Sequence, residues 1–168
     1  MKRLITFLIL AMTLSSWAAK KPNIIFLLAD DMRWDSMGHL KRFEVKTPTL
    51  DKLAQKGVRF TRSYNTTAIC MASRAQIMTG LYEFSTGSNF LHGNLAMDKW
   101  NNSYSQILRR NGYFTGFAGK FGFHINDEQG KPLKGSNGEE VVTGSFDWWS
   151  GWMGQGSYQM NENRAAHA

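Results

Sequence analysis

Residues 70–81 read CMASRAQIMTGL and contain the only cysteine of this 168-residue chain. The spacing of the apolar side chains in this stretch predicts a helix, with the cysteine in its first turn. A single cysteine forms no disulfide within its own chain, so Cys70 is either a packing residue or a residue with chemistry of its own. Arg74 lies one helical turn further along the same face, and Thr79-Gly80 is expected to close the helix.

Three stretches on either side of this helix have the pattern of β-strands. Residues 23–29 (NIIFLLA) form a continuous apolar run, which is typical of a strand covered on both faces in a parallel sheet. Residues 58–64 alternate apolar and basic side chains, as a half-buried strand does. Residues 113–118 form a third predicted strand, which ends at Gly119-Lys120.

Two further helices are predicted between these strands. A Thr-Pro pair at residues 47–48 supplies an N-cap and a first-turn proline for a helix that ends at Gly57. Ser103 and Gln106 fit a capping box for a second helix, which ends at residues 111–112. Strands that alternate with helices predict an α/β fold with a largely parallel sheet flanked by helices.

The last part of the chain, after about residue 126, is rich in glycine, asparagine and tryptophan, and its pattern does not place any regular element. Its aromatic residues have two interpretations. They can stack on sugar rings, or they can pack against the rest of the protein. The aromatic side chains concerned are Trp148, Trp149, Trp152 and Tyr158.

The N-terminus has the three parts of a secretory signal peptide. Residues 1–3 are Met-Lys-Arg, residues 4–14 are mostly apolar, and residues 16–18 (SWA) form a small-x-small cleavage pattern. The apolar run is shorter than the about 20 residues that a transmembrane helix needs. We therefore predict a signal peptide at 1–18, a mature chain at 19–168, a periplasmic or extracellular location, and no stable membrane insertion after cleavage. The alternative is an uncleaved N-terminal anchor.

The chain is basic but has no basic stripe. It contains 20 Lys and Arg against 13 Asp and Glu, which gives a net charge of +7. The basic residues are scattered and belong to no recognisable nucleic-acid-binding motif, so a nucleic-acid partner is not expected. A positive balance is compatible with an anionic substrate, although solvated lysines account for it equally well.

The pattern Cys70-x-Ala72-Ser73-Arg74, with Thr-Gly five residues after the arginine, resembles the signature of the sulfatase family. The family more often has proline where Ala72 stands. The resemblance runs from about residue 21 to 158 and corresponds to the N-terminal part of the family. It implies an alkaline-phosphatase-like α/β fold, which we expect to be truncated here. It also implies that a maturase oxidises Cys70 to formylglycine, the catalytic nucleophile once hydrated.

Asp30 and Asp31 directly follow the first predicted strand. In sulfatases the matching pair binds a divalent cation, usually calcium, together with the formylglycine that corresponds to Cys70. Calcium takes about 6–8 oxygen ligands, and the later aspartate and asparagine that complete the family's site have no counterpart in this sequence. We therefore expect weak calcium binding. Without the resemblance, the pair can equally be a polar turn that caps a helix.

Two cationic side chains and a histidine complete the candidate site. The resemblance implies that Arg74 holds the formylglycine hydroxyls and that Lys120, in a Gly-Lys-aromatic stretch, contacts a sulfate oxygen. The family usually has histidine two residues after this lysine, where this chain has Gly122. His124 lies two residues further and is the candidate replacement. The alternatives are a surface arginine and a loop histidine.

These features together predict an exported sulfuric ester hydrolase that acts on an aryl sulfate or a sulfated carbohydrate. One alternative is a formylglycine-dependent phosphodiester or phosphonate hydrolase, which would share the nucleophile and the metal. A second alternative is a non-catalytic exported fragment, which the missing metal ligands favour.

Overall fold

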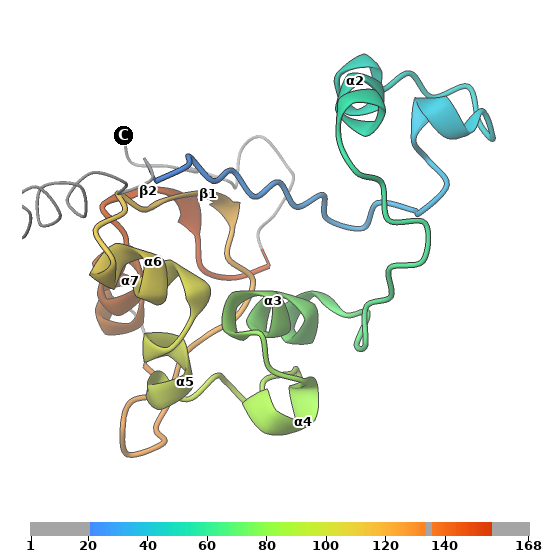
Figure 1. Cartoon of the computed structure of the whole chain (residues 1–168). Helices are drawn as coiled ribbons and strands as arrows, with labels where there is room; N and C mark the ends of the chain where they lie inside the picture. The colour runs from blue at the N-terminus through green and yellow to red at the C-terminus, as the bar shows by residue number, and fades with distance from the viewer. Residues whose placement is uncertain (1–20, 134–135, 156–168) are drawn as a thin grey trace, which may run out of the picture. The chain divides into compact units, whose positions relative to one another are not determined.

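The computed structural model describes residues 21–133 and 136–155, and the chain divides after Asp51 into an N-terminal and a C-terminal unit (Figure 1). The predicted signal peptide at 1–18 and Tyr158 lie outside the described residues. None of the helices in the described part of the chain is both long and apolar enough to cross a bilayer.

The N-terminal unit contains a 3-10 helix, η1 (Gly38–Leu40), and the start of helix α2 (Pro48–Lys56). Asp51 joins them, because its carboxylate accepts hydrogen bonds from the His39 N–H and the Thr47 hydroxyl, both at 2.9 Å. Desolvation raises the pKa of Asp51, but the bonds from Thr47 and His39 outweigh it and hold this pKa below its usual value. The predicted helix is confirmed. The Thr47 hydroxyl, however, accepts the Gly38 N–H at 2.8 Å and so ties η1 to α2.

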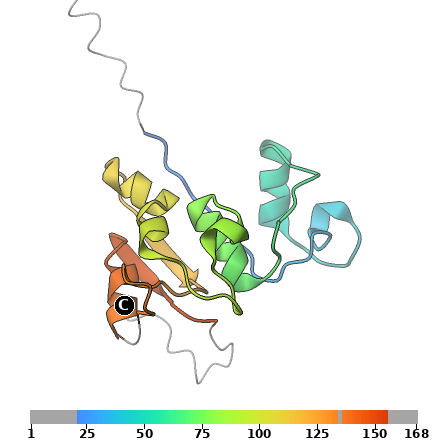
Figure 2. The ribbon, with the colours of Figure 1, turned by 90° about the horizontal axis from the view of Figure 1, so that it is seen from below.

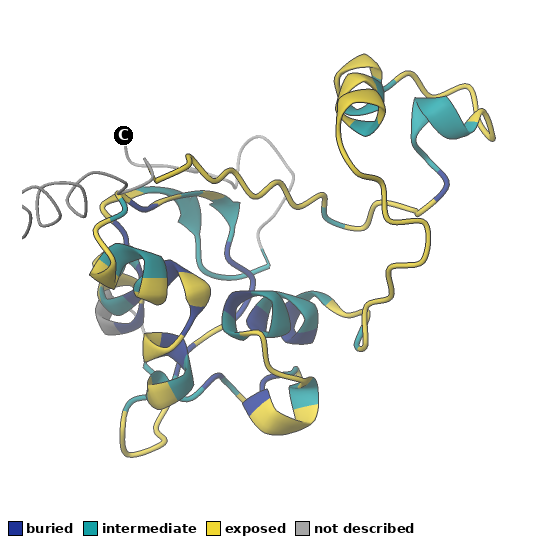
Figure 3. Cartoon of the chain, in the orientation of Figure 1, coloured by how far each residue is buried: buried dark blue, intermediate teal, exposed yellow. Residues whose placement is uncertain are grey.

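Two of the predicted strands are wrong. Residues 23–29 and 58–64 belong to no helix or strand, and their large apolar side chains are exposed (Figure 3). A strand is stable only when a neighbouring strand satisfies its N–H and C=O groups. In the described part of the chain the one sheet consists of two strands from later in the sequence. An apolar composition alone therefore did not make these segments strands.

The sheet lies in the C-terminal unit and pairs β1 (Gly116–Lys120) with β2 (Trp148–Trp152) in parallel (Figures 1 and 2). The register places Lys120 opposite Trp152. The strand predicted at 113–118 is thus confirmed but begins three residues later. Between the two strands lies α7 (Ser136–Thr143), which gives the β-α-β order that a parallel pair requires. The sequence pattern after residue 126 placed neither α7 nor β2, and the structure shows both.

Helices α3 (Cys70–Thr79), α4 (Glu83–Thr86), α5 (Met97–Asn101) and α6 (Tyr104–Arg110) lie between α2 and β1 in the sequence. α3 and α6 were predicted. α3 ends as expected, because Gly80 adopts a left-handed φ of 70° and its N–H bonds the Gln76 carbonyl. The capping box predicted for α6 is wrong. The Ser103 hydroxyl pairs with Ser105, and the Gln106 amide reaches the Ser145 carbonyl at 2.9 Å.

The core of the C-terminal unit is built around Trp100, which is 1% exposed. Its indole N–H donates to the Ser145 hydroxyl at 3.1 Å, and its ring meets Phe121 edge-on at 5.5 Å. Trp149 stacks on Phe117 at 4.8 Å, so its aromatic face serves packing. The buried face of α3 adds Met71, Ala75 and Met78 (Figure 3). This core fixes α3 against the segment that follows β1.

Asp147 clamps the beginnings of β1 and β2. Its carboxylate accepts the Thr115 N–H at 2.8 Å and the Arg109 Nε–H at 3.0 Å. The Thr115 N–H is the main cause that holds the pKa of Asp147 below its usual value. A carboxyl whose pKa is lowered by folding stabilises the fold above its unfolded pKa, and this contribution is lost as the pH falls through the folded pKa.

We therefore expect Asp147→Asn to lower the melting temperature at pH 7 and to have a smaller effect at pH 3, below the usual aspartate pKa of about 4. Thermal unfolding at the two pH values measures this difference. Glu128→Gln, which changes an exposed carboxylate, is the matched control. Equal melting temperatures of the wild type and Asp147→Asn at pH 7 would show that the Asp147 carboxylate does not stabilise the fold.

Candidate active site

Cys70 is the first residue of α3, and its side chain is half-buried. The residue before it, Ile69, has an extended backbone, and its carbonyl accepts the Ser73 N–H at 2.8 Å to close the first turn. The N–H groups at the start of a helix form a positive end that favours an anion. The sulfur of Cys70 therefore lies at the electropositive end of a ten-residue helix.

The approach to α3 is held by a short polar segment. The Asn65 amide donates to the Ser73 hydroxyl at 2.6 Å, and Thr66 hydrogen-bonds Gln76. The Thr67 hydroxyl donates to Glu83 at 2.9 Å and so ties the segment to α4. These bonds fix the path of the chain into the first turn of α3. These contacts could not be predicted from the sequence, because nothing local shows which side chains will face residues 65–67.

Arg74 reaches from α3 to the end of β1. Its guanidinium donates a hydrogen bond to the backbone carbonyl of Lys120 at 2.5 Å. Both side chains are half-buried, and both pass close to Gly122. The structure thus brings together two cationic residues that lie 46 positions apart in the sequence. Such a pair suits an oxyanion, because the guanidinium is a planar fork of donors and the ammonium is a compact charge.

The core holds Lys120 at this place. It is the last residue of β1, opposite Trp152 in the sheet, and Phe121 and Phe123 after it are each 1% exposed. The Phe121 N–H continues the pairing with a bond to the Trp152 carbonyl at 2.9 Å. The strand end is therefore anchored by both backbone and side-chain contacts.

The His124 side chain is exposed, unlike its buried neighbours in this anchored segment. Phe121, Phe123 and Ile125 are buried, whereas His124 is exposed. Its carbonyl accepts the Leu95 N–H at 3.0 Å. It borders a cavity of about 430 Å³, whose other lining residues are Asn94, Pro132, Leu133, Gly138, Glu139 and Met153. Arg74 and Lys120 are not among these residues, so a catalytic role for His124 stays a prediction.

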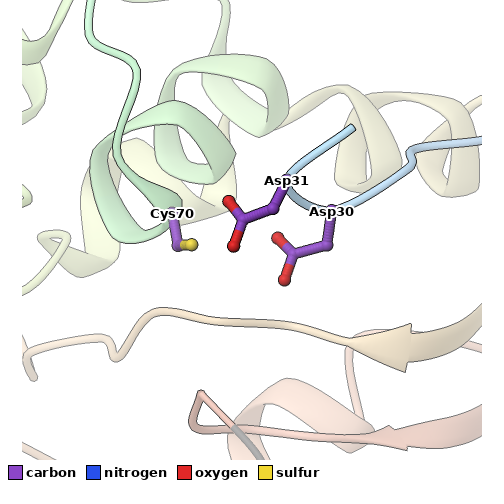
Figure 4. Close-up of side chains that lie close together, drawn as sticks. All are labelled: Asp30, Asp31 and Cys70. Atoms are coloured by element: carbon purple, nitrogen blue, oxygen red, sulfur yellow. The ribbon is translucent and has the colours of Figure 1, made fainter. Parts of the chain in front are cut away.

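Asp30 and Asp31 occupy a turn in the N-terminal unit, and their side chains are drawn in Figure 4. A carboxylate oxygen of Asp30 lies within 4.8 Å of one from Asp31. Asp31 has a left-handed φ of 52°, a conformation that aspartate tolerates better than most residues. Two like charges this close repel one another unless a cation or donors offset the repulsion. Their chemistry fits a hard cation that prefers oxygen ligands, such as calcium.

A family model described as Sulfatase matches residues 22–168, so the chain belongs to the sulfatase family and has its alkaline-phosphatase-like α/β fold. The chain is 30% identical over 143 residues to arylsulfatase D of Homo sapiens, which covers 79% of this chain and 23% of that protein.

It is also similar to bacterial proteins. It is 31% identical over 133 residues to an N-acetylgalactosamine-6-O-sulfatase of Bacteroides thetaiotaomicron, which covers 77% of this chain and 26% of that protein. It is 38% identical over 114 residues to an ulvan-active sulfatase of Formosa agariphila, with 68% and 22% covered. The chain therefore spans about a quarter of the length of these relatives.

Proposed function

We propose that this chain carries the nucleophile half of the active site of a sulfuric ester hydrolase. The observation that carries the proposal is the bond from Arg74 to the Lys120 carbonyl, which joins the helix that starts with Cys70 to the end of β1. A nucleophile position, a helix N-terminus and two cations then belong to one anchored unit. The hydrolysis of a sulfate ester uses such groups, because a nucleophile attacks sulfur and positive groups stabilise the charge on the sulfate oxygens.

Cys70 is the proposed precursor of formylglycine. The hydrate of that aldehyde supplies one hydroxyl for attack on sulfur and a second whose deprotonation releases the sulfate. The position of Cys70 is compatible with this role, because the helix N-terminus offers N–H groups to an oxyanion beside residue 70. A thiol sulfur is also a soft ligand and suits calcium poorly, whereas an oxygen at residue 70 is a hard ligand.

Arg74 and Lys120 are the proposed sulfate-binding residues. The bond to the Lys120 carbonyl holds the Arg74 guanidinium in place before substrate arrives. Preorganised cations of this kind stabilise the negative charge that develops on the sulfate oxygens in the transition state. Their half-buried setting weakens solvent screening and so strengthens this effect.

Asp30 and Asp31 are the proposed ligands of a calcium ion. Their two oxygens within 4.8 Å support a shared cation, because a cation would offset the repulsion between them. When bound, the ion would polarise the oxygen at residue 70 and offset sulfate charge. Two carboxylates fill only part of a calcium shell, so the ion also needs ligands from elsewhere.

The substrate is proposed to be a sulfated carbohydrate or an aryl sulfate, after the printed names of the relatives. Three further proposals accompany this function. Residues 1–18 direct export to the periplasm or the exterior, and a formylglycine-generating maturase acts on Cys70 before folding. His124 is proposed to contact substrate from the neighbouring cavity.

The proposal is tested with protein made in a host that supplies the maturase. We expect faster hydrolysis of 4-nitrophenyl sulfate than of the matching phosphate monoester or phosphodiester. Arg74→Ala should lower kcat/KM for the sulfate by about 100-fold or more. Arg62→Ala removes an equal charge from an exposed position and serves as the control.

Two results would favour the alternatives. Faster hydrolysis of the phosphodiester would support a phosphodiester hydrolase. An aldehyde at residue 70 without hydrolysis of either ester class would support a non-catalytic role.

A further inference from the structure

Gly122 lies just after the end of β1 and has a left-handed φ of 81°. A Cβ on this residue would lie 2.6 Å from Cδ and 3.1 Å from Nε of Arg74, and 3.4 Å from Cε of Lys120. Non-bonded carbon atoms prefer a separation of about 3.5–4.0 Å. The Arg74 side chain therefore occupies the space that a side chain on residue 122 would need.

The backbone of Gly122 has little freedom to move aside. Its N–H donates to the Met153 carbonyl at 3.0 Å, and its own carbonyl accepts the Gln155 amide at 2.8 Å. The two flanking phenylalanines, Phe121 and Phe123, are buried in the core. A Cβ added at residue 122 would therefore displace Arg74 rather than the strand end.

We propose that Gly122 is a positioning residue for Arg74. The missing side chain opens the path along which Arg74 reaches the Lys120 carbonyl. A Cβ at position 122 therefore fits only if the Arg74 side chain leaves this path.

The test is a double-mutant cycle between Gly122→Ala and Arg74→Ala, read by urea unfolding. Gly119→Ala is the matched control, because Gly119 also has a left-handed φ, of 95°, but nothing lies within 4 Å of its Cβ position. Both alanines therefore strain the backbone, and only the one at residue 122 meets Arg74.

We expect Gly122→Ala to raise the unfolding equilibrium constant in both backgrounds. The increase in the wild type should be at least about 5 times the increase in the Arg74→Ala background. The effect of Gly119→Ala should be the same in both backgrounds. Equal effects of Gly122→Ala in both backgrounds would overturn the proposal. If Gly122→Ala does not fold, recovery of folding by the added Arg74→Ala supports the proposal, and failure to recover overturns it.

A second measurement separates positioning from structural support and rests on the proposed function. Inorganic sulfate is titrated into each variant by calorimetry. We expect Gly122→Ala and Arg74→Ala each to weaken sulfate binding by about 10-fold, with no further loss when they are combined. Gly119→Ala should weaken it less.

The two ideas can fail separately. If the wild type binds no sulfate but the unfolding cycle is coupled, the proposed function fails and the positioning of Arg74 stands. If sulfate binds and the cycle is additive, the positioning proposal fails and the function stands.

Discussion

Replacement of Cys70 by alanine is expected to lower kcat/KM for sulfate esters by about 10⁴-fold or more, because the reaction loses its nucleophile. The protein fold should survive the change. Cys70 is half-buried at the first position of α3, and alanine is the best helix former. The unfolding midpoint in urea should therefore stay close to that of the wild type, so that the loss of rate reports chemistry and not stability.

The measurement compares purified wild type and Cys70→Ala with 4-nitrophenyl sulfate under saturating and subsaturating conditions. Ala72→Pro is a control variant. It introduces the residue that the family more often has at this position, leaves Cys70 unchanged and should keep the activity. If Cys70→Ala hydrolyses the substrate at the wild-type rate, residue 70 does not supply the nucleophile.

Loss of one metal carboxylate is the second large expected effect. We expect calcium to bind the wild-type chain weakly and Asp30→Asn to weaken that binding by at least about 100-fold, since even a change in the second coordination shell costs about 10- to 100-fold. The reason is that Asp30 and Asp31 are the carboxylate pair proposed to hold the ion, and calcium needs most of its oxygen ligands to bind at all.

Isothermal titration with calcium chloride measures this difference. Glu44→Gln removes an equal charge from an exposed residue of the same unit and should leave calcium binding unchanged. Tight one-to-one binding by the wild type that Asp30→Asn abolishes would show that the ligand set is complete. Binding that Asp30→Asn does not alter would place the ion elsewhere.

The helices were predictable because their signals are local. The apolar spacing of α3 and the glycine that ends it lie within one stretch of sequence, and the structure confirms both. The Arg74 contact with Lys120 joins two segments that the sequence analysis had assigned to one site. That assignment came from the family signature, because neither residue by itself indicates the other.

The strands were predicted less well because pairing depends on distant segments. Residues 23–29 have a stronger strand composition than β2, yet β2 is a strand, because β1 lies beside it and Asp147 fixes the register at their starts. The composition of β2, with one glycine, one serine and three tryptophans, did not indicate a strand. Tertiary contacts likewise overrode the capping box of α6.

Gly122 was the residue that sequence reasoning undervalued. It was noted only as a departure from the family pattern. A glycine between two phenylalanines does carry a signal, since an isolated glycine in an apolar stretch often marks the close approach of another group. Which group approaches, the Arg74 side chain, is visible only in three dimensions.

The most direct test of the whole account is the chemical state of residue 70. The protein is isolated from its native host and digested with trypsin, and the peptide of residues 63–74 is analysed by mass spectrometry with an aldehyde-reactive probe. The account predicts that this peptide carries an aldehyde that reacts with the probe. An unmodified thiol at residue 70 in every copy of the peptide would contradict it.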